Sequence, residues 1–137
     1  MVGFKVEYYW YQIGSGDFLY AFFSTIASNL ENRIWGNRFP TIMTQLYQGK
    51  IDNASIAKAL EELKIIKKEL KQFSPDEIVW DLDDSSKQPP WGKNISSEIT
   101  DLSNYFITNE GKDFIILLFN ALDKAMELNT DLRIKSM

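Results

Sequence analysis

The chain has 137 residues, of which 45% are hydrophobic and 25% are charged, a composition typical of one soluble globular domain. It contains neither cysteine nor histidine, which excludes disulfides, thiol nucleophiles, zinc sites built from Cys or His, and histidine general bases. Its 15 basic residues are outnumbered by 19 acidic ones, which argues against nucleic-acid binding because neutralising phosphates needs a surplus of Lys and Arg.

The sequence shows no sign of membrane insertion. Its N-terminus lacks a basic segment leading into a long apolar stretch, and no window has the roughly 18 uncharged apolar residues of a membrane span. We therefore expect a cytoplasmic protein that makes no membrane contact, and the absence of cysteine is consistent with that compartment.

The first elements predicted are a strand and a helix. Residues 4–12 alternate in the period-two pattern of a strand, and both faces of that strand are bulky, so we expect it away from a bare sheet edge. A Gly-Ser-Gly stretch breaks the strand, after which apolar residues recur at helical spacing. Asp17 occupies the position of an N-cap, which predicts a helix over residues 17–32.

Two further helices are predicted in the middle of the chain. Residues 41–47 lie between Pro40 and Gly49, a setting that predicts a short helix. Residues 53–73 carry apolar residues three or four apart and charged residues on the opposite face, which makes this the clearest amphipathic helix. A Ser-Pro pair ends it.

The following part combines short regular elements with a long loop. Runs rich in aromatic and β-branched residues predict strands over residues 78–80 and 105–108. Between them, residues 81–98 form a long loop that its Pro-Pro-Trp-Gly sequence orders. Ser96 or Ser97 caps a short helix after this loop.

The C-terminal part predicts a long buried helix and a closing strand. Residues 112–128 are apolar nearly all round in their first half, so we expect this helix to be buried on more than one side. Residues 132–134 add a strand. Together the elements predict a single α+β domain over residues 1–137, with a small mixed or antiparallel sheet packed against about four helices.

The start of the long loop is the most suggestive candidate site. Asp81, Asp83 and Asp84 lie within four residues and carry the oxygen ligands that Mg²⁺ and Ca²⁺ take. The segment lacks the glycine and distal glutamate of an EF-hand loop, so an acidic surface loop is favoured over a metal site. Paired carboxylates also hydrolyse glycosides, but the sequence does not give the separation that this chemistry requires.

Tryptophans near these acids have two interpretations. Trp80 lies inside the predicted strand run and is expected in the core. Trp91 lies in the polar, proline-containing loop, where an apolar anchor ringed by charge is typical of a protein interface. The alternative is that its ring tucks under the domain and orders the loop, and the sequence leaves the two interpretations equal.

Several short motifs along the chain resemble one bacterial family. They are Trp35-Gly36-x-Arg38-Phe39-Pro40, Tyr47-x-Gly49, Val79-Trp80-Asp81 and Pro90-Trp91-Gly92, followed by Tyr105-Phe106 and Gly111. With these motifs, residues 3–126 resemble the immunity protein 70 family of polymorphic toxin systems. The resemblance implies a small cytoplasmic α+β protein that protects the producing cell by binding a toxin domain and commonly blocking its active site, and it assigns no catalytic or contact residues.

We therefore predict a non-enzymatic protein without cofactor or metal, whose partner is a cognate toxin domain such as a nuclease. An acidic inhibitor would occupy a basic nuclease cleft by charge complementarity. The residues predicted to bind this partner are Asp81, Asp83, Asp84, Trp91, Trp35 and Arg38. Two alternatives stay open, namely a self-associating regulatory or interaction module and a small carboxylate-dependent hydrolase.

Overall fold

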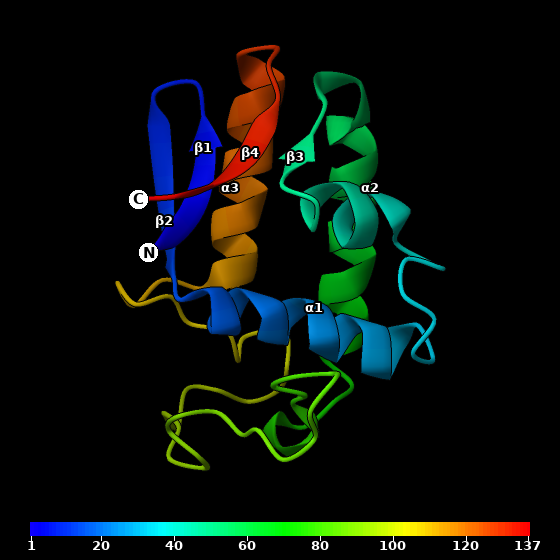
Figure 1. The fold of residues 1–137 in the computed structure, drawn as a ribbon, viewed down its shortest axis with the longest axis vertical. Coiled ribbons are helices and arrows are strands. Elements are labelled where there is room, and N and C mark those ends of the chain that lie inside the picture. The colour runs from blue at the N-terminus through cyan, green and yellow to red at the C-terminus, as the bar shows by residue number, and fades with distance from the viewer.

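A computed structural model describes residues 1–137, and Figure 1 shows helices packed behind and beneath a small sheet. The elements are β1 (Val2–Val6), β2 (Tyr9–Gly14), α1 (Gly16–Leu30), the π-helix η1 (Thr41–Leu46), β3 (Lys50–Ile51), the 3₁₀ turn η2 (Asn53–Ser55), α2 (Ile56–Leu70), the 3₁₀ turn η3 (Pro75–Glu77), α3 (Phe114–Glu127) and β4 (Leu132–Ser136). The predicted α+β class is confirmed, and the sheet is antiparallel throughout.

The N-terminal strand is in fact a hairpin, so the prediction of one strand over residues 4–12 is wrong. β1 and β2 pair antiparallel and are joined by a turn at Glu7 and Tyr8, with Glu7 at a φ of 53°. Neither residue is the Gly or Asn that marks tight turns, so the alternating pattern continues across the turn and hides it. β1 lies inside the sheet, as expected, and β2 forms an edge.

The C-terminal strand completes the middle of the sheet. The strand order is β2-β1-β4-β3, so β4 lies between the first strand of the chain and β3. Figure 1 shows the two termini beside each other, and the Met137 N–H donates to the Met1 carbonyl over 2.9 Å. The predicted strand over residues 132–134 is thus confirmed and longer, whereas the two-residue strand β3 was not predicted.

The core lies between the sheet and the helices and is centred on α3. Phe114, at the start of α3, has its ring centroid 5.7 Å from that of Phe4 in β1 and 4.6 Å from that of Phe22 in α1. All three side chains are fully buried. Burial of α3 on more than one side is confirmed, since it contacts the sheet through Phe4 and α1 through Phe22.

The cap of α1 is not the predicted residue, and α3 begins with an aspartate cap that was not predicted. The hydroxyl of Ser15, rather than Asp17, accepts the N–H of Phe18 over 3.1 Å and caps α1. Ser15 has the extended backbone that an N-cap requires, whereas Asp17 already lies in the first turn. At α3, Asp113 caps the helix by accepting the N–H of Ile116.

Residues 71–113 contain no strand and no α-helix, so the strands predicted at 78–80 and 105–108 are wrong. The Thr25 hydroxyl of α1 accepts the N–H of Val79 and donates to its carbonyl, both over 3.2 Å. The side chain of a helix residue thus satisfies backbone groups that would otherwise pair with a neighbouring strand. Residues 105–108 make only one isolated bridge, from Ile107 to Asp113.

The short helix predicted up to residue 102 is also absent. Asn104 accepts the N–H groups of Thr100 and Asp101, and the Asp101 carboxylate accepts the N–H of Ser103 over 2.8 Å. Such local bonds from Asp and Asn to the backbone compete with helix formation. We call residues 71–113 the long segment.

Candidate functional site

The three acidic residues of the candidate site form a turn held by their own side chains. The Asp81 carboxylate accepts the N–H groups of Asp83 and Asp84 over 2.9 and 3.1 Å. Asp84 in turn accepts both the N–H and the hydroxyl of Ser86, and these hydrogen bonds hold the pKa of Asp84 below its ordinary value. The carboxylates therefore point to separate partners, and no group of three acidic side chains is arranged to hold a metal ion.

A tyrosine of α1 fixes this turn to the rest of the protein. The Tyr20 hydroxyl donates to the Asp83 carboxylate over 2.6 Å. Partial burial, together with the hydrogen bond to Asp83, raises the pKa of Tyr20 to about 12. Tyr20 therefore stays a donor at neutral pH and holds Asp83 against α1. Nearby, the Leu82 N–H donates to the hydroxyl of Ser24, also on α1.

Tyr20 also connects the acidic turn to an aromatic cluster. Its ring stacks on that of Trp35 at 6.2 Å and 23°, and the ring of Tyr47 meets Trp35 edge-on at 4.8 Å. Trp35 is half-buried, and its indole N–H donates to the Met43 carbonyl over 2.6 Å. Tyr47 is 48% exposed. These rings are held rigidly and are open to solvent, which is how anchors of a binding surface are displayed.

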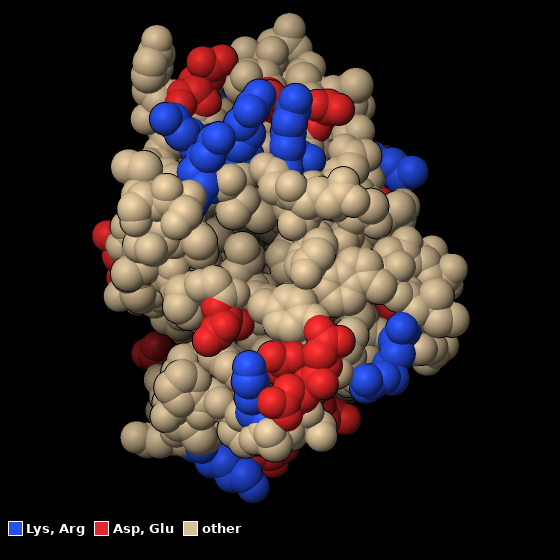
Figure 2. All heavy atoms as spheres, in the orientation of Figure 1, with Lys and Arg blue, Asp and Glu red and all other residues tan.

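We name the resulting surface the acid–aromatic face, made of Tyr20, Trp35, Tyr47, Asp81, Asp83 and Asp84. Figure 2 shows acidic side chains gathered where the long segment meets α1, beside a broad uncharged area. Sequence analysis identified the three acids and Trp35 but missed Tyr20 and Tyr47. The tyrosine at the edge of the apolar face of α1 was the only hint of this role in the sequence. Only the fold shows that Tyr20 binds an acid 63 residues away.

Trp91 makes its ring contacts outside the cluster of Tyr20, Trp35 and Tyr47. Its indole N–H donates to the Tyr105 hydroxyl over 2.9 Å, and its ring meets that of Trp80 edge-on at 5.4 Å. Burial raises the pKa of Tyr105, an effect that the hydrogen bond from Trp91 opposes. Trp91 therefore pins the long segment, as one interpretation expected, and keeps 36% of its surface exposed, so its role at an interface stays a prediction. Trp80 is buried, as predicted.

Arg38 is also engaged within the fold, in an ion pair. Its guanidinium binds the Glu69 carboxylate through two hydrogen bonds of 2.7 and 2.6 Å and also donates to the Leu30 carbonyl. The hydrogen bonds from Arg38 hold the pKa of Glu69 below its ordinary value. The polar groups of Arg38 thus tie the turn after α1 to the end of α2.

The turn containing Arg38 is built around a buried acid. Glu31 is 2% exposed and accepts the N–H groups of Gly36, Arg38 and Phe39. Gly36 has a φ of +79°, which favours glycine, and a Cβ there would lie 2.8 Å from the Thr44 hydroxyl. The Trp-Gly-x-Arg-Phe-Pro motif therefore serves to place Trp35 on the acid–aromatic face.

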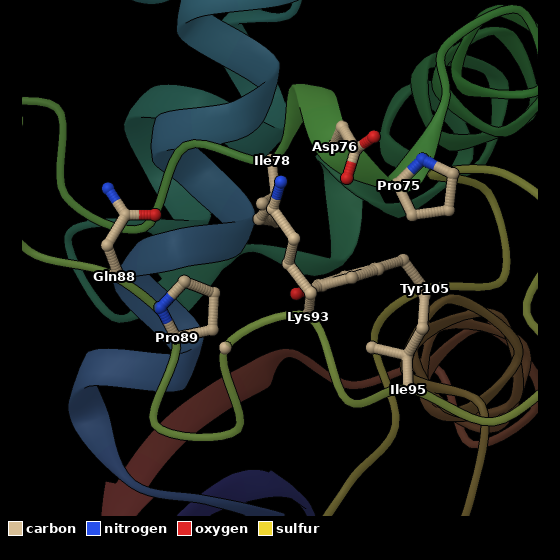
Figure 3. Close-up of a pocket in the computed structure, with 9 residues that line it drawn as sticks. Pro75, Asp76, Ile78, Gln88, Pro89, Lys93, Ile95 and Tyr105 are labelled. Atoms are coloured by element: carbon tan, nitrogen blue, oxygen red, sulfur yellow. The ribbon is translucent and has the colours of Figure 1, made fainter.

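Pockets occur in and beside the long segment, and one of them is lined by Asp81 of the acid–aromatic face. One of about 270 Å³ is lined by Pro75, Asp76, Ile78, Gln88, Pro89, Gly92, Lys93, Ile95 and Tyr105. Figure 3 shows Pro89 and Tyr105 on opposite sides of it with Lys93 between them. Asp76 is its only carboxylate, whereas acid–base hydrolysis of glycosides needs a pair. Another pocket has both Glu98 and Asp113, but Asp113 is engaged as the cap of α3.

The chain is thus a small α+β protein whose surface combines exposed rings with fixed carboxylates, features that are common at protein interfaces. Residues 4–134 match the immunity protein 70 family, and the chain therefore belongs to this family. No curated protein and no solved structure matches it. None of its helices combines the length and apolarity needed to cross a membrane.

Proposed function

We propose that this protein neutralises a bacterial toxin domain in the cytoplasm by binding it through the acid–aromatic face, without performing chemistry. Membership of the immunity protein 70 family supports an immunity role. The observation that carries the choice of surface is the Tyr20–Asp83 hydrogen bond of 2.6 Å, which joins the aromatic cluster and the acidic turn into one surface.

The aromatic part of the face supplies affinity. Tyrosine and tryptophan offer large contact areas at a low cost in conformational entropy, and they dominate binding hot spots. Here the Trp35 ring is further restrained by its hydrogen bond to Met43 and by the neighbouring rings of Tyr20 and Tyr47. Binding a toxin would therefore order few side chains, and more of the contact energy would remain as affinity.

The acidic part supplies steering and selectivity. Neither Asp83 nor Asp84 has a cationic group within 4 Å, whereas Asp81 lies 3.5 Å from Lys87. Unpaired carboxylates attract a basic surface and speed association more than they deepen affinity. A toxin with a basic active-site cleft, such as a nuclease, fits this surface, and the bound immunity protein would obstruct the path of its substrate.

Growth rescue tests the proposal. The chain is co-expressed with the toxin domain encoded beside its gene, as wild type and as the triple variant Asp81→Asn, Asp83→Asn and Asp84→Asn. Asparagine retains an oxygen that accepts the backbone hydrogen bonds of the turn, so the variant removes charge and keeps the fold. We expect wild type to rescue growth and the variant to associate more slowly with the toxin domain and with a weaker salt dependence.

A matched variant controls for net charge. Glu61→Gln, Glu110→Gln and Asp123→Asn also remove three charges, from exposed positions whose side chains make no hydrogen bond or ion pair. This control should rescue growth and associate like wild type. Equal association rates for the two triple variants would contradict the acid–aromatic face as the binding surface.

A further inference from the structure

The outer face of the sheet carries a row of basic side chains that the proposed function does not use. Lys5 in β1 is directly opposite Arg133 in β4, which is directly opposite Lys50 in β3. Lys135 is opposite Gly3, one step further along the same face. All four cations are exposed. We call Lys5, Lys50, Arg133 and Lys135 the basic sheet face.

This arrangement is unfavourable for the isolated protein. Like charges directly opposite each other in a sheet are destabilising, and here three lie in line across neighbouring strands. Arg133 lies 3.2 Å from Asp131, and Lys50 lies 3.3 Å from Asp52 and 3.8 Å from Asp131, so the repulsion is relieved at these two cations. Lys5 and Lys135 have no acidic partner within 4 Å. A negatively charged partner would relieve the rest.

The basic sheet face and the acidic turn lie on the same side of the molecule. Figure 2 shows Lys and Arg side chains over the sheet, Asp and Glu side chains where the long segment meets α1, and uncharged surface between them. The acidic turn belongs to this acidic region, because Tyr20 and Ser24 of α1 hold it there. The cations Lys5 and Lys135 therefore have counterparts in the acids Asp83 and Asp84. A second copy carries the same basic and acidic regions. After a two-fold rotation about an axis in the interface, its acidic turn faces the basic sheet face of the first copy, and its basic sheet face faces the acidic turn of the first copy.

We propose that two copies of this chain form a two-fold dimer through this side. The axis lies in the interface, so the basic sheet face of each copy covers the acidic turn of the other, and the uncharged surfaces meet across the axis. Such an interface is isologous and closes on itself. A standard interface buries roughly 800 Å² per partner, about a tenth of the 7364 Å² of accessible surface of this chain.

The dimer also has a consequence that rests on the proposed function. Because it covers the acidic turn, a second copy and a toxin domain would compete for the same surface. The dimer would then be the form of the protein that is present without toxin. The test of dimerisation contains no toxin, so its result does not depend on the proposed function.

Paired charge reversals and light scattering coupled to size exclusion test the dimer. One variant reverses the basic sheet face, with Lys5→Glu and Lys135→Glu, and the other reverses the acidic turn, with Asp83→Lys and Asp84→Lys. We expect wild type to be dimeric at low salt and to shift towards monomer as NaCl rises from about 50 to about 500 mM. Each variant alone should be monomeric, with the dimer dissociation constant raised about tenfold or more.

Mixing the two variants gives the decisive result. Each has lost one half of its complementarity, and together they regain it, so an equimolar mixture should return to the dimer mass. This recovery also shows that the variants are folded. As a control, Lys58→Glu with Lys68→Glu reverses two exposed charges on α2 and should leave the dimer intact. A monomeric wild type, or a dimer that neither reversal weakens, would overturn the proposal, as would a mixture that stays monomeric.

Discussion

Two regions of this protein are held in place by different means. In the sheet and the three α-helices, apolar side chains pack into one core and backbone groups pair within regular elements. In the long segment, residues 71–113, the backbone is fixed by side chains from α1, notably Thr25 and Ser24. The acidic turn belongs to this second region, and α1 therefore positions the candidate site as well as filling the core.

The largest expected effect comes from removing the ring that joins both regions. Phe22 is fully buried, and its ring lies 5.5 Å from that of Phe106 in the long segment and 4.6 Å from that of Phe114 in α3. Phe22→Ala should lower the free energy of unfolding by about 3 to 5 kcal/mol in urea denaturation. Ile116→Ala, at a position 46% exposed on α3, is the control and should change it by less than about 0.5 kcal/mol.

A smaller effect is expected at the turn after α1. In the wild type, the Glu31 carboxylate accepts three backbone N–H groups. Glu31→Gln keeps the size of the side chain but replaces one of the two accepting oxygens with an amide NH₂, which is a donor. The free energy of unfolding, measured by urea denaturation, should fall by about 2 to 3 kcal/mol, because buried donors are left without an acceptor. Glu61→Gln, on the exposed side of α2, should be neutral. Equal stability of the two variants would show that this turn does not depend on Glu31.

Thr25→Val separates the two regions most cleanly. Valine has the shape of threonine but cannot pair with the N–H and carbonyl of Val79, so the variant should lose about 1 to 2 kcal/mol. Amide hydrogen exchange should accelerate in residues 77–83 and stay unchanged in α3. Uniform acceleration through both regions would contradict the view that α1 holds the long segment locally.

The smallest effect is expected at the ion pair of Arg38 and Glu69. Glu69→Gln should lower the free energy of unfolding by about 1 kcal/mol at neutral pH. The effect is small because both partners are partly exposed and solvent screens their attraction. The pKa of Glu69 is lowered in the folded state, so this contribution is present above its ordinary value of 4.5 and is lost as the pH falls through the lowered value. Urea midpoints of wild type and variant should therefore differ at pH 7 and converge at low pH.

The sequence predicted the elements whose side chains alternate between core and solvent. The helix beginning near residue 53 was found because one face of it is apolar, and the helix ending near residue 128 because its first half is apolar nearly all round. Their ends were misplaced by about one turn or less. The hairpin was missed because Glu7 and Tyr8 give no turn signal. The strand predicted at residues 78–80 is absent because Val79 pairs with a side chain more than 50 residues away. The helix predicted up to residue 102 is absent because Asp101 and Asn104 bond to the local backbone.

The candidate site could be predicted only in part for the same reason. Its acids are adjacent in the sequence and were recognised as a group. Tyr20 and Tyr47 join them through tertiary contacts, which no local pattern records. Arg38 and Trp91 were selected by residue type and motif, but their polar contacts lie within the fold, with Glu69 and Tyr105.

Amide hydrogen exchange of the chain, as a monomer at high dilution and bound to its toxin domain, tests the acid–aromatic face most directly. We predict that binding protects residues 81–84 and the connection from η1 to β3 around Tyr47. The segment around Trp91 should exchange at the same rate in both states. Protection confined to residues 89–95, or to helix α2, would contradict the account and place the toxin elsewhere.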